Sequence, residues 1–175
     1  SSGYAWAVPA VDLLYENGVV GGVGNSSFAP ASPLTRGSFI TMLDRALGFP
    51  HGAQQNFPDV PDGQYYTESV RSAYALGIVN GFSDGTFRPD APITRAEAMT
   101  MLYRAMQTMG WVIGTEDTSI LNSYADGAYV ADYARGAMSV MVQTGIVQGS
   151  GGMLEPGRIM TRAEMAVALA RALTL

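Results

Sequence analysis

The sequence predicts a mostly α-helical protein made of three helix-loop-helix repeats. Two observations predict this class: one motif recurs three times, and each copy carries apolar residues at helical spacing. The motif is a box of Gly, two apolar residues, a variable residue and Gly, at 18–22, 77–81 and 145–149. A Thr-Arg pair follows every box, at 35–36, 94–95 and 161–162.

The first helix of each repeat lies upstream of its box. Aligned positions five and three residues apart share one helical face, and the first position is aromatic in every copy: Trp6, Tyr65 and Tyr133. The Gly that opens each box stands where a helix ends with a left-handed residue, which Gly adopts without steric cost: Gly18, Gly77 and Gly145. Pro9 is tolerated only in a first turn, so the first helix is expected to begin near Val8.

The second helix of each repeat begins at the Thr-Arg pair. In Thr94-Arg95-Ala96-Glu97 the Thr is an N-cap and the Glu completes a capping box, and 161–164 repeats this pattern. Repeat one has Gly37-Ser38 instead and lacks the Glu. The apolar positions that follow form a stripe that we assign to the core: Phe39, Ile40, Leu43 and Leu47; Ala98, Met99, Leu102 and Met106; Met165, Ala166, Leu169 and Leu173.

The repeat boundaries are expected near residues 50 and 112, because Gly, Pro, Asp and Asn gather around 50–63 and 110–127. The repeats are then 1–50, 51–111 and 112–175. A helix, loop and helix of about 60 residues is too small to bury its stripe alone, so the three repeats should pack as one unit.

Composition excludes several classes of function. The net charge is -5, so a broad surface for nucleic acid or anionic membrane is not expected, and all ten basic residues are Arg. There is no Cys and one His, His51, so neither a metal site nor a cofactor is predicted. No apolar run approaches the length of a membrane span, and Ser1-Ser2-Gly3 does not begin an export signal, so a mature or excised module of a larger protein is expected.

One motif order carries a resemblance. Gly-Ile-Val-Asn-Gly, Phe-Ser-Asp-Gly-Thr-Phe-Arg-Pro-Asp and Ile-Thr-Arg-Ala-Glu, within residues 77–97, resemble the S-layer homology module, and three tandem copies cover nearly the whole chain. The resemblance implies a pseudo-threefold assembly with a central three-helix bundle and three prongs. It also implies that grooves between prongs bind secondary cell-wall polysaccharide, often at a pyruvylated amino sugar. An extracellular place on the bacterial cell surface, without a covalent bond, follows from this.

The arginines of the Thr-Arg pairs are the main candidate ligand contacts. The resemblance carries this role to Arg95 and Arg162, and less directly to Arg36. Each guanidinium should lie at a helix N-terminus, where unpaired N–H groups and the dipole favour a carboxylate. The alternative is a solvated Arg or one paired with a nearby Asp or Glu, but three equivalent copies favour ligand contact.

Other candidates surround these arginines: Gly22, Gly81 and Gly149 of the boxes, Ser83 and Asp84 of the loop, and the rings of Trp6 and Tyr65. The aromatic residues align with the buried stripe, so core packing is the favoured alternative for at least part of each ring. Asp84-Gly85 is first a turn, and Glu97 and Glu164 are caps without an acid/base role. Only repeat two keeps the whole pattern, so one dominant groove using Arg95 is expected.

The leading hypothesis is therefore a non-catalytic module that anchors an exported protein to the cell wall. A second hypothesis is protein lattice assembly or domain spacing without wall binding. A carboxylate-pair glycosidase is the third and weakest, because the recurrent acids are explained as caps. Three further arginines recur nine residues after the first set, near helix C-termini where a cation is favoured: Arg45, Arg104 and Arg171.

Overall fold

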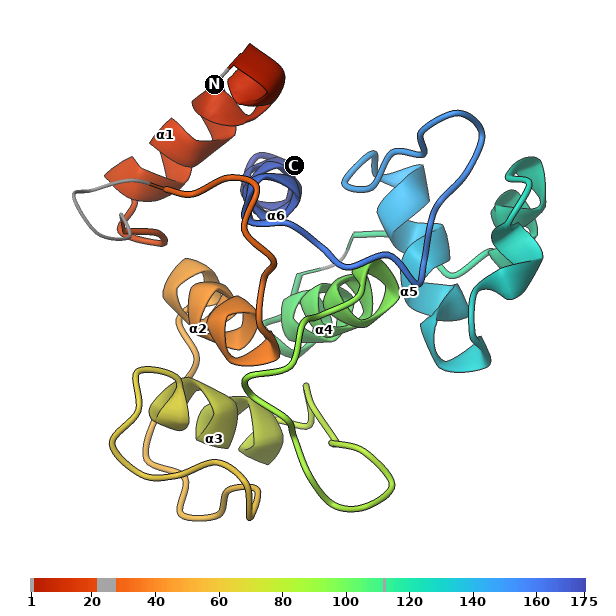
Figure 1. Cartoon of the computed structure of the whole chain (residues 1–175). Helices are drawn as coiled ribbons and strands as arrows, with labels where there is room; N and C mark the ends of the chain where they lie inside the picture. Colours follow the sequence, from red (N-terminus) through yellow and green to blue (C-terminus); the bar gives the residue numbers. More distant parts are fainter. Residues whose placement is uncertain (1, 22–27, 112) are drawn as a thin grey trace.

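Helices dominate the computed structural model, which describes residues 2–21, 28–111 and 113–175 and contains no strand within those ranges (Figure 1). The α-helices are α1 (Val8–Glu16), α2 (Arg36–Leu47), α3 (Thr67–Ala75), α4 (Arg95–Thr108), α5 (Asp132–Gln143) and α6 (Arg162–Leu173). The 3-10 helices are η1 (Ser2–Ala7), η2 (Thr118–Ser123) and η3 (Gly127–Tyr129). The predicted mostly helical class is confirmed.

Hydrogen bonds at the helix ends confirm the predicted boundaries. The hydroxyls of Thr94 and Thr161 accept hydrogen bonds from the N–H groups of Glu97 and Glu164, and each Glu carboxylate accepts a hydrogen bond from the N–H of its Thr. Thr35 accepts from the Ser38 N–H and caps α2 without a Glu. α1 begins at Val8, and the three glycines that open the boxes have φ values of 71°, 75° and 77°: Gly18, Gly77 and Gly145.

Helices of different repeats pack together. α3 packs on α2, α5 packs on α4 and α1 packs on α6, so each first helix contacts the second helix of the preceding repeat, in cyclic order (Figure 1). α2 also contacts both α4 and α6. The two ends of the chain are brought together by the α1–α6 pair, and the apolar stripes are buried through contacts between repeats. The boundaries near 50 and 112 stay predictions.

A ring of three backbone hydrogen bonds joins the segments that precede α2, α4 and α6. The Leu34 N–H donates to the Met160 carbonyl (3.0 Å), the Ile93 N–H to the Leu34 carbonyl (2.9 Å), and the Met160 N–H to the Ile93 carbonyl (2.9 Å). All three side chains are buried. The ring therefore fixes the starts of the three second helices relative to one another.

The predicted stripe forms the core, while the aromatic positions do not. All twelve stripe residues are buried except Leu47 and Leu173, which are partly buried and pack against the core. Trp6, Tyr65 and Tyr133 are 54%, 60% and 55% exposed, so less than half of each residue's surface is covered and the core packing expected for part of each ring is limited to that part. These residues lie before the first helix or in its first turn, so the buried face of the helix starts after them.

Candidate ligand-binding grooves

The first groove is a cavity of about 580 Å³ between the box of the second repeat and the start of α5. Its floor is a face of α4 with residues three or four apart: Glu97, Thr100, Met101 and Arg104. Gly81 and Phe82 of the second repeat, Arg36 of the first and Tyr133 of the third also line it. All three repeats therefore contribute to one groove.

The second groove, about 450 Å³, follows the same plan one repeat further on. Its floor is the equivalent face of α6: Glu164, Val167, Ala168 and Arg171. Gly149 of the third repeat, Arg95 of the second and Trp6 of the first line it as well. Arg95 thus shares a groove with the box of the following repeat, and Arg36 is the arginine that meets the complete motif of repeat two.

Arg36 is enclosed by the second repeat. Its Nε donates to the Phe87 carbonyl (2.8 Å), its Nη1 pairs with the Glu97 carboxylate, and its Cζ lies 4.5 Å from the ring centroid of Phe82. The side chain is 5% exposed. Burial lowers the pKa of the guanidinium, and the charge of Glu97 opposes that shift. Arg36 is therefore paired with a Glu, as the alternative to ligand contact in the sequence analysis expected.

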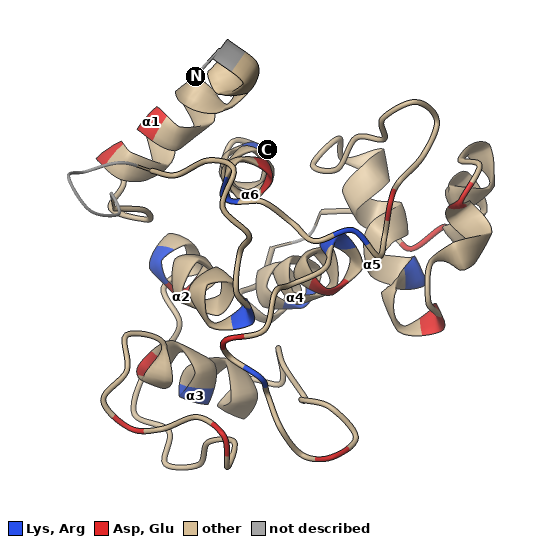
Figure 2. Cartoon of the chain, viewed as in Figure 1, with Lys and Arg blue, Asp and Glu red and all other residues tan. Residues whose placement is uncertain are grey.

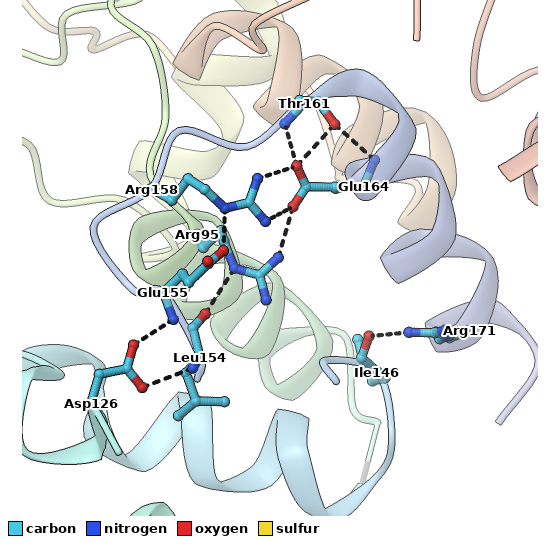
Figure 3. A network of polar contacts seen from close by, with 9 residues as sticks. All are labelled: Arg95, Asp126, Ile146, Leu154, Glu155, Arg158, Thr161, Glu164 and Arg171. Atoms are coloured by element: carbon cyan, nitrogen blue, oxygen red, sulfur yellow. Dashed lines mark hydrogen bonds and ion pairs between the residues drawn. The ribbon is translucent and has the colours of Figure 1, made fainter. Parts of the chain in front are cut away.

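Arg95 repeats these contacts with the third repeat. Its Nε donates to the Leu154 carbonyl (3.0 Å) and its Nη1 to Glu164 (2.8 Å). Arg158 donates two 2.8 Å hydrogen bonds to the same carboxylate, so two guanidinium groups bind Glu164 (Figure 3). Burial raises the pKa of Glu164, but the bonds and charges of Arg158, with Thr161 and Arg95, outweigh burial and leave it lowered.

Arg162 has a different environment because repeat one lacks the capping Glu. Its Nε donates to the Phe28 carbonyl (2.9 Å) and its Cζ lies 4.8 Å from the Phe28 ring centroid. Within the described ranges no carboxylate forms an ion pair with it. Ser38 occupies the position of the missing Glu and bonds the Tyr65 hydroxyl (2.8 Å). Burial lowers the pKa of Arg162.

The helix N-termini do not offer free N–H groups, which corrects the sequence argument for anion binding there. In α2 the N–H groups of Arg36 and Gly37 donate to the carbonyls of Ala91 (2.9 Å) and Pro89 (2.8 Å). The equivalent donors of α4 and α6 are satisfied in the same way by the next repeat: Arg95 to Arg158, Ala96 to Pro156, Arg162 to Ser32 and Ala163 to Pro30. The first turns thus bind neighbouring backbone, because the repeats interlock there.

Two acidic residues that the sequence argument missed hold the loops before these contacts. Asp59 accepts the N–H groups of Phe87 (2.9 Å) and Arg88 (2.7 Å). Asp126 does the same for Leu154 and Glu155 at 2.8 Å each (Figure 3). These hydrogen bonds stabilise backbone in which the second residue of each pair has a positive φ: 59° at Arg88 and 53° at Glu155. A signal was present, since an aromatic residue precedes each Asp by two positions.

The loop candidates are placed away from the grooves. Asp84 accepts from the N–H (3.0 Å) and the hydroxyl (2.6 Å) of Thr86, and these bonds lower the pKa of Asp84 to about 2. Ser83 and Asp84 are exposed, and neither is among the described residues that line the two grooves. The turn interpretation of Asp84-Gly85 is confirmed. Gly22 lies outside the described residues.

Acidic and basic positions are both spread over several elements of the ribbon (Figure 2). No cluster of three or more His, Asp or Glu residues in the described ranges could hold a metal ion. Every described helix is too short or too polar to cross a membrane. Arginines and aromatic rings line both grooves: Arg36 and Arg104 with Phe82, Tyr129 and Tyr133 in the first, and Arg95, Arg158 and Arg171 with Tyr4 and Trp6 in the second.

The protein-family model described as the S-layer homology domain matches the chain three times, at residues 1–40, 56–99 and 123–166. These segments contain the three boxes and the first turns of α4 and α6, whereas the later floor residues of both grooves, Arg104 and Arg171 among them, lie after the matched ranges. The three matches follow the order of the repeats recognised in the sequence.

Similar proteins include two surface-layer proteins and one enzyme. The Surface-layer 125 kDa protein of Lysinibacillus sphaericus is 29% identical over 97% of this chain and 14% of its own length. The S-layer protein of Bacillus licheniformis is 27% identical over 92% of the chain and 18% of its own length. An endoglucanase of Bacillus sp. (strain KSM-635) is 27% identical over 93% of this chain and 17% of its own length. The chain thus spans less than a fifth of each relative, and the similarity to the glucanase is confined to that part.

Proposed function

Because the chain belongs to the S-layer homology domain family, we propose that it anchors an exported protein by binding secondary cell-wall polysaccharide in its grooves. The family and the surface-layer relatives place the chain at the bacterial cell surface. The proposed binding is non-covalent and non-catalytic, and the ligand is a polymer that carries pyruvyl carboxylates.

The repetition of one groove plan is the observation that carries this proposal. In each groove a half-exposed aromatic ring stands near a floor that ends in an arginine: Tyr133 with Arg104, and Trp6 with Arg171. A ring that is apolar on its face and accessible to solvent suits the apolar face of a sugar. A guanidinium suits a carboxylate through charge-assisted hydrogen bonds.

The arginines of the Thr-Arg pairs have a supporting part in this proposal. Arg36 and Arg95 form groove walls and hold neighbouring repeats in place, while Arg162 has no carboxylate partner among the described residues. The boxes that contain Gly81 and Gly149 line the same grooves. A polymer would therefore contact several repeats at once and bind only when they are correctly packed.

Sedimentation with purified wall sacculi tests the proposal. The chain should pellet with sacculi that retain their polysaccharide, and it should remain in solution with sacculi from which the polysaccharide has been extracted. Removal of the pyruvyl groups by mild acid should release most of the chain. A chain that never pellets refutes wall binding, and its self-association in light scattering would then favour lattice assembly or spacing.

A further inference from the structure

The two cations that line the first groove differ in what they bind. The Nε and Nη1 of Arg36 are engaged by Phe87 and Glu97, and the residue is almost fully buried. Arg104 is partly exposed, and no described residue accepts a hydrogen bond from it or pairs with it. The uncompensated positive charge of the groove therefore belongs to Arg104.

The floor of the groove is also polarised along α4. Glu97 and Arg104 are seven residues apart on one face, a separation of about 10 Å along the helix axis. Between them lie Thr100 and Met101, which carry no charge. Because Glu97 is paired with Arg36, that end of the floor carries no net charge, and an acidic ligand is attracted toward the Arg104 end.

In the second groove the carboxylate at the start of the floor is also paired, and the arginine at the other end is a weaker free cation. Glu164 holds Arg95 and Arg158, whereas Arg171 lies seven residues further on, apart from that cluster (Figure 3). Arg171 donates to the Ile146 carbonyl at 3.3 Å, so it is partly engaged. In both grooves the arginine nine residues after the Thr-Arg pair carries the available charge.

On this basis, and resting on the proposed function, we infer that Arg104 is the residue that receives the ligand carboxylate in the first groove. Arg36 is then a positioning residue that holds Glu97 at the opposite end. The sugar lies between the two ends, beside Tyr133, with its carboxylate directed toward the C-terminal part of α4. This assignment moves the specificity-determining charge from the first helical turn to the third.

Two ligands and two variants test the inference by calorimetric titration. The ligands are a pyruvyl ketal of an N-acetylhexosamine methyl glycoside and its isopropylidene counterpart, in which a methyl group replaces the carboxylate. The unaltered chain should bind the acid about tenfold more tightly than the neutral ketal. Arg104→Gln should remove this preference and leave binding of the neutral ketal unchanged.

Arg45→Gln is the matched control, because Arg45 has the same helix position in repeat one but lines neither groove as described. It should keep the preference. A preference that survives Arg104→Gln, or is lost equally in both variants, overturns the assignment, and so does equal binding of the two ligands by the unaltered chain. If the chain nevertheless sediments with wall sacculi, such a result refutes only the assignment of the carboxylate contact to Arg104. If the chain does not sediment with sacculi, the proposed function is refuted as well. Melting temperatures of the variants should match the unaltered chain.

Discussion

The Nη1 of Arg95 in α4 donates a 2.8 Å hydrogen bond to the Glu164 carboxylate in α6, which joins the second repeat to the third. The same carboxylate accepts two bonds from Arg158 and caps its own helix (Figure 3). One carboxylate therefore couples a helix cap, a groove wall and a contact between repeats.

Glu164→Gln should lower the free energy of unfolding by about 2 kcal/mol, because it leaves Arg95 without its ion-pair partner in a site where that arginine is largely buried. Chemical denaturation measures the change. Glu155→Gln is the control, since Arg158 is the one cation among the described residues that pairs with Glu155, and Glu155 is far more exposed. Its cost should be below about 0.5 kcal/mol. Equal effects of the two substitutions would contradict the coupling role of Glu164.

The contribution of Glu164 should depend on pH in one direction. The folded-state pKa of Glu164 is lowered from its ordinary 4.5, so its stabilisation is fully present above pH 4.5. It is lost as pH falls through the lowered folded-state pKa. The difference in unfolding free energy between the unaltered chain and Glu164→Gln should therefore be constant from pH 5 to 7, within about 0.5 kcal/mol, and shrink below pH 4.5. A difference that grows in acid would show the opposite linkage.

Ser38→Glu should stabilise the chain by about 1 kcal/mol, because it restores a capping box on α2 and supplies a carboxylate for Arg162. Thermal and chemical denaturation measure the gain. Ser38→Gln isolates the cap, since its amide reaches the same N–H without a charge. In an Arg162→Gln background the two substitutions should become equivalent. A lower melting temperature for Ser38→Glu would mean that the Ser38–Tyr65 hydrogen bond is the more important contact.

Gly81→Ala should destabilise the chain by more than Gly77→Ala, although both residues have positive φ, 77° and 75°. A Cβ at position 81 would lie 2.6 Å from the Phe57 ring and 2.8 Å from the Thr86 carbonyl, whereas nothing lies within 4 Å at position 77. We expect about 1 kcal/mol at position 77 and at least about 2 kcal/mol at position 81. Similar losses of unfolding free energy at both positions would mean that glycine is required at position 81 by its backbone conformation alone.

Tyr133→Ala should weaken binding of wall polysaccharide about tenfold and change the unfolding free energy by less than about 1 kcal/mol, because the ring is exposed at the first groove. Pull-down with immobilised polysaccharide measures the binding. Tyr15→Ala is the control, since Tyr15 is 66% exposed but is not among the described groove residues. Equal retention of the two variants would exclude stacking on Tyr133.

Much of the fold could be predicted because its signals are local. The caps at Thr94 and Thr161, the left-handed Gly77 and the apolar stripe each depend on residues within one or two helical turns. The groove partners could not be predicted in this way. Arg36 and Glu97 are 61 residues apart, and Arg95 and Glu164 are 69 apart, so helical periodicity does not link them and only the packing of successive repeats brings them together.

The sequence by itself determined the repeats, the helix boundaries and the family. Only the tertiary structure decided which arginines are engaged and which remain available, because that depends on the cyclic order in which the helices pack. The first turns of α2 and α4 face the loops of the next repeat, so Arg36 and Arg95 form hydrogen bonds that link one repeat to the next. Arg104 lies two turns beyond Glu97, past those contacts, and keeps its charge toward the groove.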